Sequence, residues 1–174
     1  MPRKTITIIF VFISSICFGQ TKEEINFALD KIGKEVDSSQ NIVFNKNAKF
    51  IMQYGDTSIR ILMPIFLDST KTSTYSSCQN RFLSKGELAI ILADRIDFMI
   101  PYFEITGIQN CTMAICPNNP NLIEYYFHWD WGYSIEKFYK KYAEWFYGPN
   151  RKKWLKMFNK KSKAKSLAFF IEKQ

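Results

Sequence analysis

The sequence has few of the residues and none of the common motifs on which most enzymes depend. It has a single histidine among its 174 residues, so any histidine-dependent catalysis must use His128. It contains no G-x-S-x-G, no H-E-x-x-H, no phosphate-binding G-x-x-x-x-G-K-[ST] and no dinucleotide-binding G-x-G-x-x-G. The absence of these motifs points to no cofactor and favours a binding protein over an enzyme.

Glycine and proline are also scarce, with seven and six residues. Their low content excludes a collagen-like or linker-like polymer. Hydrophobic residues make up 47% of the chain and charged residues 23%, a composition too apolar for a disordered protein. The length suits one globular domain, which we expect over residues 20–174.

The first 19 residues are typical of a secretory signal peptide. Arg3 and Lys4 give a short positive region, and residues 5–18 are almost wholly apolar. Gly19 then completes a small-x-small cleavage site. The apolar run is too short to span a bilayer as a helix, so it predicts cleavage and a secreted or periplasmic protein. Lipoprotein processing at Cys17 is the alternative, which the bulky residue before it disfavours.

Few cysteines remain after such cleavage. They are Cys78, Cys111 and Cys116, and an oxidising compartment favours a disulfide between two of them. Cys111 and Cys116 are close in the sequence and are the predicted pair, while pairing of Cys78 with either one is the alternative. No C-x₂-C spacing is present, so the sequence predicts no metal site.

Apolar residues at helical spacing predict a mainly α-helical domain of five or six helices. Capping boxes begin two of them, Thr21 with Glu24 and Ser84 with Glu87. The helical pattern covers residues 22–37, 47–54, 57–67 and 85–99, follows Asn119 and Ser134, and returns at about 150–160. We expect Asp94, Arg95 and Asp97 to face solvent.

Other segments predict extended or irregular structure. Residues 68–83 are rich in serine and threonine and are expected to form a loop. A short extended segment is expected within residues 100–117, and residues 58–63 alternate in a way that a strand would also explain. A mixed α+β fold is therefore the alternative fold class.

Residues 47–68 combine a helix, Gly55, a second helix that contains Pro64, and a stop at Asp68. This layout resembles one helical hairpin of a HEAT-type repeat. The resemblance is confined to these residues, because no second copy follows at the period of such repeats. It implies a helical hairpin and nothing about activity.

Aromatic residues gather in residues 122–158, which hold 14 of the 29 aromatic residues and all four tryptophans. Most of them fall at helical spacing and are expected to form core. Four lie near a predicted helix break and are candidates for an exposed binding surface. These are Tyr125, Trp129, Trp131 and Tyr133.

Charge is distributed unevenly along the chain. Residues 20–136 carry 10 basic and 14 acidic residues, whereas residues 137–174 carry 12 and 2. This asymmetry predicts an anionic partner for the C-terminal helices, with Lys152, Lys153 and Lys156 as contacts. For an exported protein the partner would be a protein or another anionic component of the cell envelope, as for an inhibitor or an immunity-type protein. Nucleic acid is not expected, because lysine outnumbers arginine 19 to 5.

Two alternative functions remain from the sequence. A peripheral protein could contact an anionic membrane surface through the same basic helices. A cell-envelope hydrolase could use Cys78 as nucleophile, His128 as base and Asp130 to orient the base. The hydrolase needs an exposed thiol, so a disulfide at Cys78 would remove it.

Overall fold

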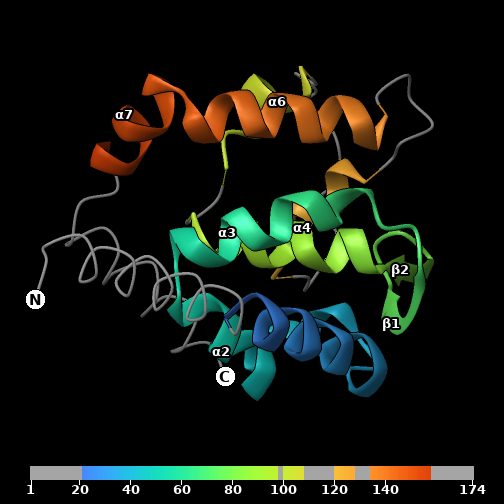
Figure 1. Cartoon of the computed structure of the whole chain (residues 1–174). Helices are drawn as coiled ribbons and strands as arrows, with labels where there is room; N and C mark the ends of the chain where they lie inside the picture. The colour runs from blue at the N-terminus through green and yellow to red at the C-terminus, as the bar shows by residue number, and fades with distance from the viewer. Residues whose placement is uncertain (1–20, 98–99, 108–119, 128–133, 158–174) are drawn as a thin grey trace, which may run out of the picture.

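The computed structural model describes residues 21–97, 100–107, 120–127 and 134–157, which form three layers of helices with a small hairpin at one end (Figure 1). The lower layer holds the helix at residues 21–35, the 3₁₀ helix η1 (Ser39–Phe44) and α2 (Lys46–Gln53). The middle layer holds α3 (Asp56–Leu62), the 3₁₀ helix η2 (Met63–Leu67) and α4 (Lys85–Ile96), with strands β1 (Lys71–Ser76) and β2 (Arg81–Ser84) beside them.

The upper layer holds α5 (Tyr102–Thr106), α6 (Ile135–Tyr147) and α7 (Pro149–Met157). A last 3₁₀ helix, η3 (Leu122–Tyr126), contacts both α4 and α5 and so links the upper layer to the middle one. The predicted mainly α-helical fold is confirmed. None of the helices in the described ranges is long and apolar enough to cross a bilayer.

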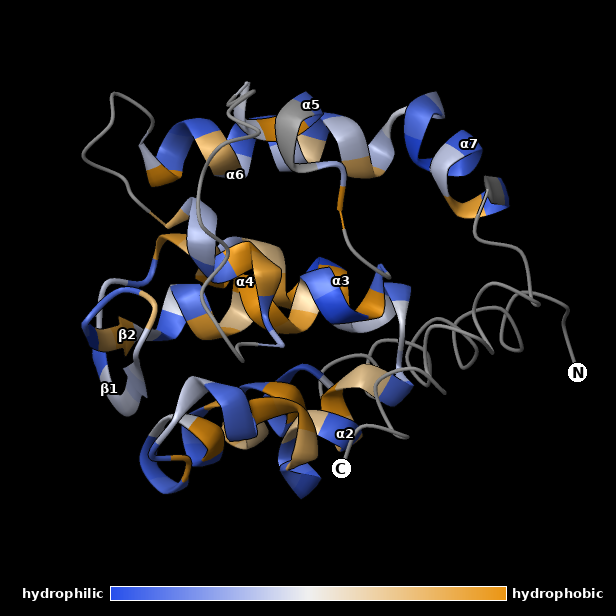
Figure 2. Cartoon of the chain, turned by 180° about the vertical axis from the view of Figure 1, so that it is seen from behind, coloured by the Kyte–Doolittle hydropathy of each residue, from blue (hydrophilic) through white to orange (hydrophobic). Residues whose placement is uncertain are grey.

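Helix α4 forms the centre of the domain. Ser84 Oγ accepts a hydrogen bond from the Glu87 amide at 3.2 Å, and Glu87 Oε2 accepts one from the Ser84 amide at 2.8 Å. This capping box begins the helix as predicted. Nine consecutive residues, 86–94, are buried, because helices of the other layers cover α4 on both sides (Figure 2). A side chain at Gly86 would overlap the Phe66 carbonyl, so only glycine allows η2 to approach this closely.

The acidic residues of α4 do not face solvent, so that expectation is wrong. Asp94 is 2% exposed and Asp97 is 1% exposed, while Arg95 is half-buried. Asp94 Oδ1 accepts a hydrogen bond from the Ile100 amide at 3.0 Å. Arg95 donates to Asn121 Oδ1 from Nη2 at 2.9 Å. Each buried charged group therefore has a partner outside the helix. The spacing of apolar residues along the helix cannot predict such partners.

The serine- and threonine-rich segment forms a β-hairpin instead of the expected loop. Strands β1 and β2 are antiparallel, with Tyr75 opposite Phe82 and a register shift between Lys71 and Tyr75. Exposed and buried side chains alternate along β1, and Thr74 and Ser76 are fully buried. Threonine is β-branched and favours strands, and here small hydroxyl side chains replace apolar ones on the inner face.

The two helices that resemble a HEAT-type hairpin are present. Helix α2 ends at Gln53, Gly55 adopts a φ of 54°, and α3 begins at Asp56. The positive φ explains why glycine lies at the break. Pro64 lies in the first turn of η2, where the helix tightens. Residues 58–63 are therefore helical, and the strand alternative for them is wrong.

The extended segment that we expected within residues 100–117 is contradicted in its described part. Residues 102–106 form the short helix α5. Residues 108–119 lie outside the described ranges. Helices α6 and α7 begin and end close to the predicted positions, with Gly148 between them.

Candidate functional site: a lysine face on α6 and α7

Helix α6 attaches the upper layer through its aromatic side chains. Phe138, Tyr142, Trp145 and Phe146 are all buried. The ring of Phe66 in η2 lies 5.2 Å from that of Tyr142 and 6.2 Å from that of Phe138. These aromatic residues form core, as their spacing predicts. The opposite side of α6 is left for charged residues.

Helix α7 is held in place by one buried arginine. Arg151, 8% exposed, donates to Asp97 Oδ1 from Nη2 at 2.6 Å and from Nε at 3.1 Å. It also binds Asp56 with two hydrogen bonds of 2.6 and 2.9 Å. Its guanidinium lies 4.2 Å from the centre of the Phe146 ring. A planar guanidinium with five donors can make all these contacts at once, whereas a lysine could not.

Burial and pairing shift the pKa values in this cluster in predictable directions. Burial raises the pKa of Asp97, and its hydrogen bonds with Arg151 and Tyr142 offset only part of this effect. Burial and the Asp97 carboxylate raise the pKa of Tyr142, whose hydroxyl donates to Asp97 Oδ2 at 2.8 Å. Desolvation alone would lower the pKa of Arg151. Its hydrogen bonds to Asp56 and Asp97 have the larger, opposite effect, so the pKa lies above the ordinary value for arginine. The guanidinium is therefore always charged.

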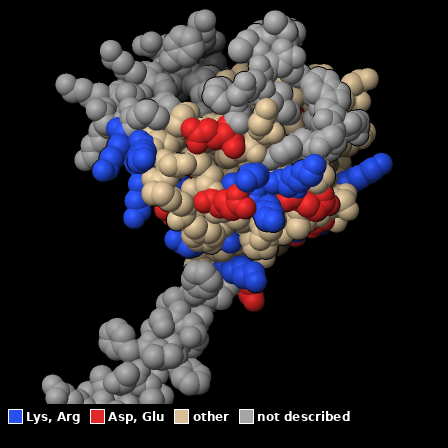
Figure 3. All heavy atoms as spheres, turned by 90° about the horizontal axis from the view of Figure 1, so that it is seen from above, with Lys and Arg blue, Asp and Glu red and all other residues tan. Residues whose placement is uncertain are grey.

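Lysines cover the outer side of the two helices, which we call the lysine face. Its members are all exposed: Lys137, Lys140, Lys141, Lys152, Lys153 and Lys156. Glu136 and Glu144 are the exposed acidic residues of the same helices, and Lys141 pairs with Glu144 at 3.0 Å. Figure 3, which looks down on this layer, shows basic side chains on it with acidic side chains between some of them. None of the ion pairs found among the described residues involves Lys152, Lys153 or Lys156.

One aromatic residue is exposed beside the lysine face. Tyr147, the last residue of α6, is 63% exposed. The guanidinium of Arg60 lies 5.3 Å from the centre of its ring and 5.4 Å from that of Phe146. Gly148 follows, and a side chain there would meet the Glu144 carbonyl at 2.7 Å. The tight connection fixes Tyr147 and the start of α7 in one arrangement.

The predicted aromatic contacts are only partly described. Tyr125 lies in η3, half-buried, with its ring 5.5 Å from that of Tyr126. Trp129, Trp131 and Tyr133 lie outside the described residues. Sequence reasoning missed Tyr147, because it follows directly on aromatic residues that form core. Only the orientation of α6 on the domain shows that the Tyr147 side chain faces outward.

The residues of the hydrolase alternative are not brought together in the described structure. Cys78 is disulfide-bonded, so in this state its sulfur offers no thiolate for attack. His128 and Asp130 lie outside the described residues, as do Cys111 and Cys116 and the predicted signal peptide at residues 1–19. Among the residues described, no group of three or more histidine, cysteine or acidic side chains could hold a metal ion.

A buried polar cluster, not predicted from the sequence, fixes η3 beside the hairpin. Glu124 is fully buried, and its Oε2 accepts hydrogen bonds from Ser39 at 3.0 Å and from Ser76. Its Oε1 accepts one from Asn121 at 3.0 Å. Gln79 donates to the Glu124 backbone carbonyl at 2.5 Å. Every carboxylate oxygen has a donor, which is the condition for burying such a group.

The comparisons with known proteins give no further guide to this arrangement. No family model matches the chain. No curated protein and no solved structure matches it either.

Proposed function

We propose that this protein is an exported interaction protein that binds an acidic protein partner through the lysine face. The observation that carries the proposal is the arrangement of α7. Lys152, Lys153 and Lys156 are exposed on a helix whose position is fixed by the buried Arg151. Charged side chains on a rigid helix lose less entropy on binding than those on a mobile segment.

The neighbouring aromatic side chain supports a protein partner. Exposed tyrosine next to basic residues is typical of interface hot spots, because the ring supplies contact area at low entropy cost. Tyr147 has this setting, with Arg60 stacked on its ring. The lysines would steer an acidic partner toward the face, and Tyr147 would provide apolar contact after docking. Inhibition of an acidic envelope enzyme is one form that such binding could take.

A membrane surface fits the same helices less well. Interfacial helices insert a broad apolar face among the lipid headgroups. On the described part of α6 and α7, Tyr147 is the only large hydrophobic side chain that is exposed. Trp154 is half-buried against the core. The face therefore offers charge but little apolar surface to insert.

Photocrosslinking in the producing cells tests the proposal. Benzoylphenylalanine in place of Tyr147 should form an adduct with one acidic protein, identified by mass spectrometry. The triple change Lys152→Glu, Lys153→Glu and Lys156→Glu should abolish this adduct. High salt during crosslinking should weaken it, because exposed charges are screened.

A matched control changes the net charge of the protein by the same amount, but on another layer. Lys34, Lys46 and Lys49 are exposed on the lower layer, and their reversal to glutamate should leave the adduct unchanged. An adduct that persists in the α7 triple variant would contradict the proposal. So would binding to anionic vesicles that competes with the protein adduct.

A further inference from the structure

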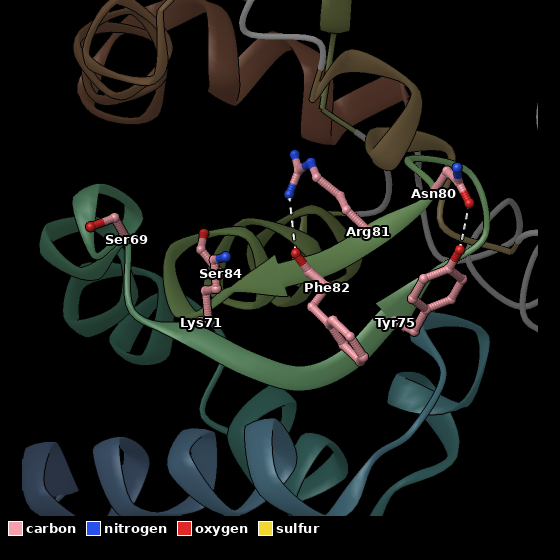
Figure 4. A pocket seen from close by; sticks show the side chains of 7 residues that line it. All are labelled: Ser69, Lys71, Tyr75, Asn80, Arg81, Phe82 and Ser84. Atoms are coloured by element: carbon pink, nitrogen blue, oxygen red, sulfur yellow. Dashed lines mark hydrogen bonds between the residues drawn. The ribbon is translucent and has the colours of Figure 1, made fainter.

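The β-hairpin carries a second candidate site, on a different part of the molecule from the lysine face. Two aromatic residues lie directly opposite each other on β1 and β2 and point to the outer side. Phe82 is 55% exposed and Tyr75 is 37% exposed, with ring centres 5.5 Å apart at 77°. Arg81 points away from the two rings, as expected for successive residues of a strand (Figure 4).

A hollow of about 390 Å³ lies on this outer side (Figure 4). Its volume is near the lower end of the range for small-ligand sites. The register shift between Lys71 and Tyr75 accompanies it, and such bulges bend a strand and redirect its side chains. The lining residues are Ser69, Lys71, Tyr75, Asn80, Arg81, Phe82 and Ser84.

The polar groups of the hollow are mainly hydrogen-bond donors. Lys71 is exposed and offers three N–H groups. Asn80 accepts from the Tyr75 hydroxyl at 2.6 Å through Oδ1, which leaves its amide N–H₂ to donate. Ser84 Oγ accepts from the Glu87 amide, so its hydroxyl hydrogen can donate outward. No lining residue carries a carboxylate, and the side chain of Arg81, which is one of the lining residues, is paired with the buried Glu87.

The hairpin is held rigidly, so the site is formed before any ligand arrives. The Tyr75 amide donates to the Asp37 carbonyl at 2.8 Å, and the Lys85 amide donates to the Thr70 carbonyl at 2.8 Å. The Gln79 side chain in the turn between the strands donates to the Glu124 backbone carbonyl. Exposed aromatic rings on such a rigid element are typical of binding surfaces.

We propose that this hollow binds an acidic saccharide, with a sugar face stacked on the Phe82 ring beside Tyr75 and a carboxylate on Lys71. The ligand must present acceptor oxygens, because the few polar groups of this mainly apolar hollow are hydrogen-bond donors. It must carry negative charge to complement Lys71. It also needs a flat C–H face to stack on the Phe82 ring, with the Tyr75 ring at 77° beside it. A uronic-acid sugar meets all three conditions, whereas a neutral sugar lacks the charge and a simple aromatic acid lacks the acceptors.

Titration with trigalacturonate, followed by the backbone amide signals of residues 69–84, tests this site. The acid oligosaccharide should shift these signals at millimolar concentrations, and neutral galactotriose should bind at least fivefold more weakly. Phe82→Ala should weaken binding about tenfold or more through the lost stacking surface, which aromatic anchors of this kind supply. Lys71→Gln should remove most of the preference for the acid sugar.

Matched variants separate the site from general effects. Phe27→Ala removes an exposed phenylalanine from the helix at residues 21–35, and Lys34→Gln removes an exposed lysine from the same helix. Both should bind as the native protein does. The triple reversal of Lys152, Lys153 and Lys156 should also keep saccharide binding, so failure of the lysine-face proposal would leave this one standing.

Three results would overturn the proposal. One is the absence of signal shifts with trigalacturonate at any concentration. Another is equal loss of binding in Lys71→Gln and Lys34→Gln. The third is a dimer in sedimentation that becomes a monomer in Phe82→Ala, which would make a second copy of the chain the occupant. Circular dichroism of each variant confirms that it remains folded.

Discussion

Arg151 in α7 and Asp97 at the end of α4 form a buried ion pair across 54 residues of sequence, with Nη2 2.6 Å from Oδ1. Asp97 is 1% exposed and Arg151 is 8% exposed. Because α7 carries the lysine face, this pair connects the fold of the core to the surface that we propose for binding.

Arg151→Ala should therefore strongly destabilise the protein. It leaves the Asp97 carboxylate buried without its cation, and breaking a buried pair in this way costs about 3–5 kcal/mol. Urea unfolding at neutral pH, followed by circular dichroism, measures the change. The neighbouring exposed Lys152→Ala should change the free energy of unfolding by less than about 0.5 kcal/mol. Equal stability of the two variants would mean that Arg151 does not hold α7.

The raised pKa of Asp97 gives stability a defined dependence on pH. Its pKa in the folded protein lies above the ordinary value of 3.8, because burial disfavours the charged form more than its partners favour it. Between these two pKa values the folded state binds more protons than the unfolded state, so the contribution of Asp97 to stability rises as pH falls. The opposite sign applies to Asp68, whose pKa is lowered by hydrogen bonds with Thr70.

Comparison with Asp97→Asn isolates this contribution, because asparagine cannot titrate. The free energy of unfolding of the native protein minus that of the variant should increase as pH falls from 7 toward 4. The carboxyl carbon of Asp97, observed by NMR, should titrate with a midpoint above that of Asp68. A difference that stays constant over this range would show that Asp97 has no raised pKa.

The sequence predicted helices well where the signal is local. The Ser84–Glu87 capping box and the apolar residues behind it set the start of α4, and Ser134 and Gly148 mark the limits of α6. Capping and periodicity involve neighbours within one turn, so they can be read without knowing the fold.

The same local reasoning failed where partners are distant. The sequence around Asp97 predicts a solvent-exposed side chain, because nothing near it in the sequence shows that Arg151 will reach it. The polar residues Thr74 and Ser76 favour a loop when only the sequence is considered, yet both are buried in the hairpin. Ser76 is satisfied by Glu124, which lies 48 residues away. The hollow at Phe82 depends on this hairpin and so could not be predicted either.

Glu124 provides a direct test of that distant cluster. In Glu124→Gln one carboxylate oxygen is replaced by an N–H₂ group, which would face donors from Ser39 and Ser76 or from Asn121. A buried donor without an acceptor costs about 1–3 kcal/mol, so we expect a loss of that size in urea unfolding. Glu23→Gln, at an exposed helical position, is the matched control and should be neutral. Equal effects of the two changes would contradict the role of the cluster.

The state of Cys78 decides between a binding protein and the hydrolase alternative. Cys78 lies in the turn between β1 and β2 and is disulfide-bonded. We expect iodoacetamide to leave it unmodified in the folded protein and to alkylate it only after reduction, because a disulfide sulfur has no thiolate. Non-reducing peptide mapping should recover it cross-linked to a second cysteine peptide.

Unfolding without reductant controls for simple burial of Cys78, since a buried free thiol would then react. Alkylation of Cys78 in the unreduced folded protein would contradict this expectation and would restore a nucleophile to the hydrolase alternative.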